Sequence, residues 1–162
     1  MINLNNILKV AGQKIVKELS NNIREQKQID GKIINSVSFS TMKIRLKKGM
    51  TSVTRLLYTG YFWQNAFKYI VNNNTLTIYA NTSQYPGSSV SYEDIISYND
   101  VDNERTNQRV SPSNRPKIFP KYEEDLLKMK CIDEIKKDIE KETIMQIEQN
   151  FGPIPKITLV IG

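Results

Sequence analysis

The sequence predicts an α+β fold: a small antiparallel sheet flanked by an N-terminal and a C-terminal long helix, with a long polar loop. Two observations predict it. Apolar residues recur at steps of three and four near both ends of the chain, which is the spacing of amphipathic helices. Between these regions an Asn cluster joins two short apolar runs, as in a β-hairpin. The 162 residues suit a single domain over residues 1–150, followed by a β-prone tail over residues 151–162.

The first predicted element is an amphipathic helix from Leu4 to Ile23. Lys9, Lys14 and Lys17 face outward from it. Its apolar face, which we expect to enter the core, consists of Leu4, Ile7, Leu8, Ala11, Ile15, Leu19 and Ile23.

An irregular stretch over residues 33–46 follows the Asp30-Gly31 turn, and we expect extended segments there. On a strand, the cations around Ile44 and Leu46 share one face. Such a strand either faces DNA or an acidic partner, or is an exposed strand whose lysines discourage edge pairing. The cations of this predicted basic strand are Lys43, Arg45, Lys47 and Lys48.

The strongest strand prediction is a hairpin. Residues 67–71 lead into Asn72-Asn73-Asn74, which tolerates left-handed turn conformations, and residues 75–80 then alternate strictly. Residues 81–115 are rich in Asn, Ser, Asp and Pro, so we expect a long connection there, with a short helical turn over residues 92–98.

The second long helix is predicted between Lys121 and Gln149, and Gly152-Pro153 ends it. Its apolar stripe consists of Leu126, Met129, Ile132, Ile135, Ile139 and Ile147. The acids at residues 123–125 suit the positive end of a helix dipole. In the tail after Pro155, three aliphatic residues alternate, and the tail either completes its own sheet or pairs with the edge of a neighbouring subunit's sheet. These residues are Ile157, Leu159 and Ile161.

The net charge of +6 is unevenly distributed along the chain. Residues 1–60 hold eleven Lys or Arg against three acids, whereas the remainder carries a net charge of −2. A basic half is compatible with a surface facing DNA, a surface facing an acidic partner, or a well-solvated exterior. We find no apolar run long enough to span a bilayer and no signal peptide, so we expect the protein to stay where it is made.

The composition argues against enzymatic chemistry. The chain has no histidine, which excludes Ser-His-Asp, Cys-His and zinc chemistries, and it has no phosphate-binding glycine loop. The acidic run at residues 100–104 lacks the glycine and the glutamate of a calcium-binding loop, so a solvated loop is favoured. The lone Cys131 is expected to pack in the interior. We therefore predict no catalytic residue, no bound metal and no cofactor.

Several motifs occur in an order that resembles the phage virion morphogenesis family of tail-completion and head-tail connector proteins. Asp30-Gly31 is similar to its glycine-containing segment, and residues 40–43 are similar to a Thr-x-x-Lys-like stretch. A Leu-x-Thr-Gly-x-Phe segment, a Tyr-Ala pair ending a strand and an Arg-Pro-x-x-Phe element follow. The residues that carry these motifs are Leu57, Thr59, Gly60, Phe62, Tyr79, Ala80, Arg115, Pro116 and Phe119. The chain departs from the family pattern after Tyr-Ala, where residues 81–92 are inserted.

The resemblance implies a non-enzymatic virion structural protein, a head-tail connector or tail-completion subunit in the neck or tail. Such a protein is assembled in the host cytoplasm as a homo-oligomeric ring of six or twelve copies. Its partners are portal or adaptor proteins, tail proteins and the packaged DNA that passes through the channel, without a membrane. On this hypothesis the predicted basic strand lines or flanks the channel, and the tail pairs with a neighbouring subunit.

The alternative hypothesis is a sequence-nonspecific nucleic-acid-binding protein that uses the basic N-terminal half. The aromatic residues at positions 61–69 then either stack on bases or form a core or subunit interface. A carboxylate-metal nuclease is a third hypothesis, with candidate ligands Glu93, Asp94, Asp100 and Asp102.

Overall fold

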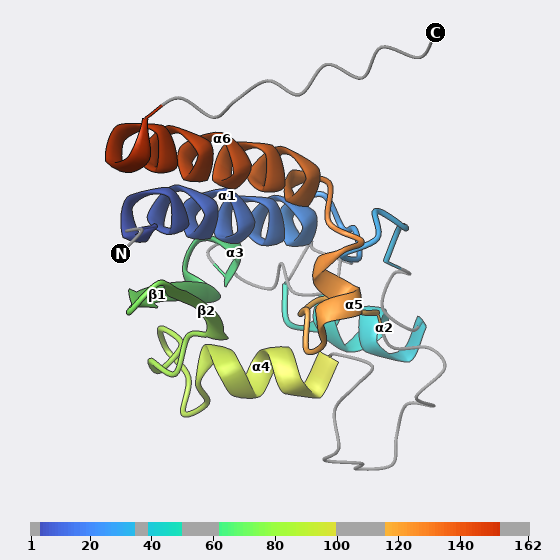
Figure 1. Cartoon of the computed structure of the whole chain (residues 1–162). Coiled ribbons are helices and arrows are strands. Elements are labelled where there is room, and N and C mark those ends of the chain that lie inside the picture. Colours follow the sequence, from blue (N-terminus) through green and yellow to red (C-terminus); the bar gives the residue numbers. More distant parts are fainter. Residues whose placement is uncertain (1–3, 35–38, 50–61, 100–115, 153–162) are drawn as a thin grey trace, which may run out of the picture.

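The computed structural model describes residues 4–34, 39–49, 62–99 and 116–152 and has the predicted α+β fold. Figure 1 shows a two-stranded antiparallel sheet covered by helix α1, with helix α6 lying on the other side of α1. The long helices are α1 (Asn5–Arg24) and α6 (Cys131–Phe151), and the strands are β1 (Phe67–Asn72) and β2 (Thr75–Ala80). The shorter helices are α2 (Phe39–Lys47), α3 (Phe62–Asn65), α4 (Tyr92–Asn99) and α5 (Glu123–Leu126).

Helix α1 is the central element because its predicted apolar stripe is buried from Ala11 to Ile23, whereas Leu4, Ile7 and Leu8 are half-buried. Ala11, Ile15, Leu19 and Ile23 are all at most 4% exposed. Gly12 allows the helix to approach the sheet closely, since a Cβ atom there would lie only 2.7 Å from Cγ of Tyr69. The helix prediction from Leu4 to Ile23 is therefore confirmed.

The hairpin also forms as predicted. Phe67 pairs with Ala80 and Asn72 with Thr75 across the two strands. Asn73 and Asn74 form the turn with φ of 47° and 58°, the left-handed conformation that the two central residues of a type I′ turn require. The turn is tied to the start of α1, because the N–H of Leu4 donates to Oδ1 of Asn74 at 3.0 Å. This bond fixes how far the hairpin extends along α1.

Helix α6 begins later than predicted, because the backbone breaks between α5 and α6. Glu18 of α1 determines where α6 starts: its carboxylate accepts the N–H groups of Lys130 at 2.9 Å and of Cys131 at 2.8 Å. The prediction of one continuous helix from Lys121 is therefore wrong, because residues 123–126 form the separate helix α5 and residues 127–130 are not helical. The predicted end is confirmed at Gly152, whose φ of 85° favours glycine.

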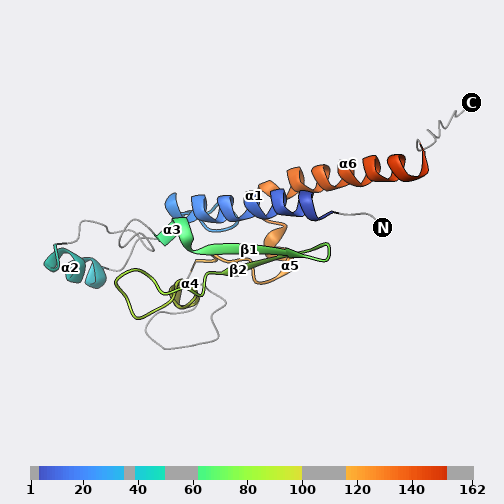
Figure 2. The same ribbon diagram turned by 90° about the vertical axis from the view of Figure 1, so that its left-hand side faces the viewer.

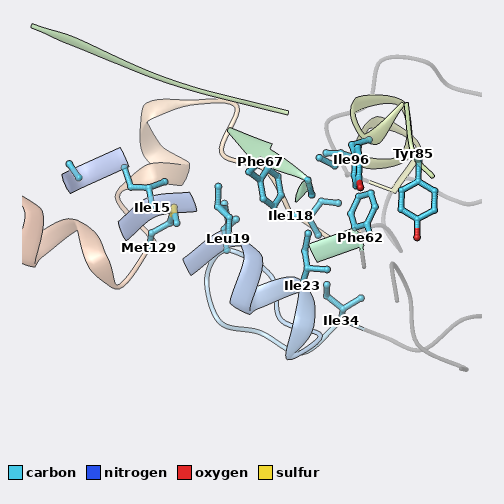
Figure 3. Close-up of a cluster of buried hydrophobic side chains, with 14 of the residues drawn as sticks. Ile15, Leu19, Ile23, Ile34, Phe62, Phe67, Tyr85, Ile96, Ile118 and Met129 are labelled. Atoms are coloured by element: carbon cyan, nitrogen blue, oxygen red, sulfur yellow. The ribbon is translucent and has the colours of Figure 1, made fainter. Parts of the chain in front are cut away.

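The core lies between α1, the hairpin and the segment before α5. Figure 3 shows Leu19 and Ile23 of α1 near Phe62, Phe67 and Ile118. Two backbone segments distant in sequence meet here, since the N–H of Ile29 donates to the carbonyl of Lys117 at 3.0 Å.

The predicted basic strand is wrong, because residues 39–47 form helix α2. Met42, Arg45, Leu46 and the lysines are good helix formers, and Ile44 is the one β-branched residue among positions 42–48. The alternation of cations over so few positions is compatible with the two-residue period of a strand and with the roughly 3.6-residue period of a helix. On a helix, positions 43, 45 and 47 do not share one face.

Candidate functional site

The motif residues that the structure describes lie around the base of the hairpin. The Phe62 ring lies 6.0 Å from the Tyr85 ring and 5.5 Å from the Tyr92 ring, measured between centroids. Phe67, which pairs with Ala80, stacks on Phe119 at 5.9 Å. Segments about fifty residues apart in sequence therefore meet in one aromatic core.

Other predicted site residues have different positions. Pro116 is buried and Tyr79 is 37% exposed on the outer face of β2. Several lie outside the described residues, namely Leu57, Thr59, Gly60, Arg115, Ile157, Leu159 and Ile161. Asp100 and Asp102 lie outside them as well.

Asn81 connects three elements at the hairpin base, and the sequence analysis missed it. Its backbone N–H donates to Ala66 at 2.8 Å, and its side-chain amide donates to the carbonyl of Asn65 at 2.7 Å. Its own carbonyl accepts the N–H of Glu93 at 2.9 Å, at the start of α4. This 4% exposed amide thus fixes α3, β2 and α4 relative to one another.

Tyr85 has a buried hydroxyl in this aromatic core. Burial raises the pKa of the Tyr85 phenol, and a charge on Tyr92 would raise it further. Among the described residues the hydroxyl has no hydrogen-bond partner. The ring therefore contributes through packing, in the same way as Phe62.

A buried ion pair fixes the segment that follows the Arg-Pro-x-x-Phe motif. Nζ of Lys117 lies 2.8 Å from Oδ2 of Asp125, and the Asp125 side chain is 6% exposed. Burial alone would raise the pKa of Asp125. Hydrogen bonds from Lys117, from the Tyr122 N–H and from Lys128 outweigh that effect, so the pKa lies below its usual range. The pair orients α5 against the core.

The outer face of the hairpin is exposed and partly apolar. Phe67, Tyr69 and Val71 point toward α1, whereas Lys68 and Ile70 point away, and Ile70 is 47% exposed. Within the described ranges the sheet consists of these two strands, so each strand has an edge with no strand beside it. Such an edge can accept a further strand.

The cations predicted as a site lie on and just after α2. Lys43, Lys47 and Lys48 are exposed, and Arg45 is half-buried. Two aliphatic residues between them are also exposed, Ile44 at 57% and Leu46 at 56%. The surrounding sequence strengthens the positive field, because residues 31–92 hold seven Lys or Arg and no carboxylate.

The C-terminal half of α6 forms a second exposed surface. Figure 2 shows its last turns running past the N-terminal end of α1. Ile135 is the one buried residue of this helix. Beyond it, Ile144 is 40% exposed, Met145 44% and Phe151 85%. The helix therefore continues well beyond the contacts that hold it to α1.

The structure does not assemble the described residues into a reactive thiol site or a metal site. Burial raises the pKa of Cys131 to about 12, helped by its hydrogen bond with Glu18, so the thiol stays protonated at neutral pH. In the described ranges, no three His, Cys, Asp or Glu side chains gather where a metal ion could be held. No helix among the described residues has the length and apolarity needed to cross a bilayer.

Comparison of the chain with protein-family models, with curated proteins and with solved structures finds no match.

Proposed function

We propose that this chain is a non-enzymatic virion structural protein, a head-tail connector or tail-completion subunit that forms a homo-oligomeric ring between head and tail. The observation that carries the proposal is the position of the family-like motifs. Phe62, Ala80 and Phe119 come from three distant segments and lie around the base of the hairpin. Motifs that build a scaffold suit a protein whose function is geometric.

Two features support assembly with other subunits. The hairpin has edges with no strand beside them in the described ranges, and the β-prone sequence after Pro155 is suited to pair with such an edge. The molecule also carries exposed apolar side chains at α2 and at the end of α6. Contiguous patches of exposed apolar side chains are rare on soluble monomers. Such patches therefore favour contacts with partners.

Localisation in virions tests this proposal. We expect antibodies or a fused tag to place the chain at the neck or tail in electron micrographs of particles. We also expect deletion of its gene to leave filled heads and tails that do not join. Particles that contain no copy of the chain, or that assemble normally without it, would contradict the proposal.

Sequence-nonspecific nucleic-acid binding is the second candidate, favoured by the stretch over residues 31–92 that lacks carboxylates. It predicts that the isolated chain retains DNA at low salt and releases it as salt rises, because counterions are released on binding. Neutralising Lys43, Arg45, Lys47 and Lys48 to Gln together should then abolish retention. Equal retention by that variant and by wild type would remove this candidate.

A further inference from the structure

One surface of α2 combines cations with an aliphatic side chain. Residues on a helix follow one another at about 100°, so Lys47 and Lys48 flank Ile44. Lys48 still follows the helical path, because its N–H donates to the carbonyl of Ile44 at 3.2 Å. Leu46 lies about 160° away from Ile44, on the opposite side of the helix, and the half-buried Arg45 lies about 100° away. We call the exposed side, Ile44, Lys47 and Lys48, the basic face.

The end of α6 has the opposite charge and a similar apolar content. Glu140, Ile144 and Glu148 follow one another at steps of four and therefore share one side, which Phe151 extends. All four side chains are exposed. Glu142 lies on the other side of the helix and the exposed Lys141 borders this side, so over residues 140–151 the side carries two carboxylates and one lysine. We call Glu140, Ile144, Glu148 and Phe151 the acidic face.

We propose that the basic face of one copy docks onto the acidic face of a second copy of this chain in a head-to-tail contact. Lys47 and Lys48 meet Glu140 and Glu148 there, while Ile44 packs against Ile144 and Phe151. This contact rests on the proposed function, because it supplies one interface of the ring.

The arrangement of the two faces requires the contact to be between molecules. In Figure 2, α2 lies at one end of the molecule and the C-terminal end of α6 lies at the other, and Figure 1 also separates them. When the contact joins two different surfaces, any open assembly of subunits has one free basic face at one end and one free acidic face at the other. Repetition therefore closes into a ring or continues as a filament.

Charge complementarity favours a second copy over nucleic acid as the occupant of the basic face. Ile44, which is 57% exposed, lies between the cations, and phosphate groups offer it nothing to bury against. A partner with carboxylates spaced around apolar residues satisfies both features, and the acidic face has that pattern.

A charge-swap experiment tests the contact. Lys47→Glu/Lys48→Glu and Glu140→Lys/Glu148→Lys are each expected to weaken self-association by about tenfold or more, since like charges then face each other. An equimolar mixture of the two variants is expected to associate again, because each interface in the mixture has opposite charges. Sedimentation velocity at low and high salt measures both effects.

Controls with the same change of net charge separate this contact from a general charge effect. Lys9→Glu/Lys17→Glu on the exposed side of α1 and Glu123→Lys/Glu124→Lys on α5 are expected to associate as the wild type does. Swap variants that associate like the wild type, or a mixture that stays as weak as its components, would overturn the head-to-tail contact. Localisation at the neck would still stand in that case.

Disulfide trapping tests the contact if it is too weak to detect by sedimentation velocity. Chains that carry Ile44→Cys and Phe151→Cys separately, both with Cys131→Ser, are mixed under mild oxidation. We expect the mixed disulfide to exceed either homodimer, and to decrease at high salt. Thr77→Cys on the hairpin replaces Ile44→Cys as the control. A wild type that sediments as a monomer, together with no excess of the mixed disulfide over the control, would contradict the proposal.

Discussion

The centre of the molecule and its two ends use similar side chains in different ways. Along α1, Ile15, Leu19 and Ile23 are at most 4% exposed, because the hairpin covers the stripe. At the far ends, Ile44 on α2 and Phe151 on α6 are mostly exposed, 57% and 85%. The chain therefore buries its own apolar surface in the middle and leaves apolar surface exposed at the ends.

The ends are also electrostatically different from the centre. Lys14 at the centre lies 2.9 Å from both Glu134 and Asp138, so the two long helices satisfy each other's charges. The hydrogen bonds from Lys14 to these carboxylates raise its pKa. At the ends, charges of one sign gather on α2 and the other sign prevails on the last turns of α6.

The largest effect is expected at the centre. Leu19→Ala removes a fully buried side chain and leaves a cavity under the hairpin. We expect the free energy of unfolding to fall by about 3 kcal/mol, measured by urea denaturation. A loss below about 1 kcal/mol would contradict the packing of α1 against the sheet.

The same contrast explains what could be predicted from the sequence. The stripe of α1 and the hairpin were predictable because burial imposes a regular period over many residues. The prediction from the sequence pattern is wrong at α2. Positions 42–47 include no buried side chain there, so burial does not impose a regular apolar period on the segment. Sequence pattern is thus most informative where a segment packs within its own chain.

Two features of the candidate site could not be read from the sequence for a different reason. The break before α6 depends on Glu18, which accepts the N–H of Cys131 from a helix more than one hundred residues earlier. The role of Asn81 depends on contacts with Asn65 and Glu93 that arise once the hairpin forms. Both are tertiary hydrogen bonds, and neither leaves a local pattern.

The next effect concerns the ion pair beside the core. Asp125→Asn keeps the shape but weakens the bonds from Lys117 and Lys128, and we expect a loss of about 2 kcal/mol. The pKa of Asp125 is lowered in the folded state. Its contribution is therefore present above the ordinary carboxyl range near pH 4 and is lost as pH falls through the lower folded value.

Urea denaturation at several pH values measures this contribution. We expect the difference between wild type and Asp125→Asn to shrink as the pH is lowered below about 4. Glu123→Gln, an exposed position on the same short helix, is the control and should differ little from wild type at neutral pH. A difference that is constant with pH would show that Asp125 acts without its charge.

A smaller loss is expected where α1 approaches the sheet. Gly12→Ala improves helix propensity by about 1 kcal/mol but places a Cβ atom against the Tyr69 ring, so we expect a net loss of about 1 to 2 kcal/mol. Gln13→Ala, at the adjacent exposed position, should leave stability within about 0.5 kcal/mol of wild type. Thermal unfolding compares the two variants, and a stabilised Gly12→Ala protein would contradict the close approach.

The smallest effect on stability is expected at the end of α6. It tests most directly whether the ends of the molecule differ from its buried centre. Ile144 is 40% exposed, so Ile144→Ser should change the free energy of unfolding of the dilute protein by no more than about 0.5 kcal/mol. The same change should weaken self-association, because the acidic face loses its central apolar side chain. A loss of stability as large as that of Asp125→Asn would mean that this helix end packs within its own chain, and the distinction between centre and ends would then fail.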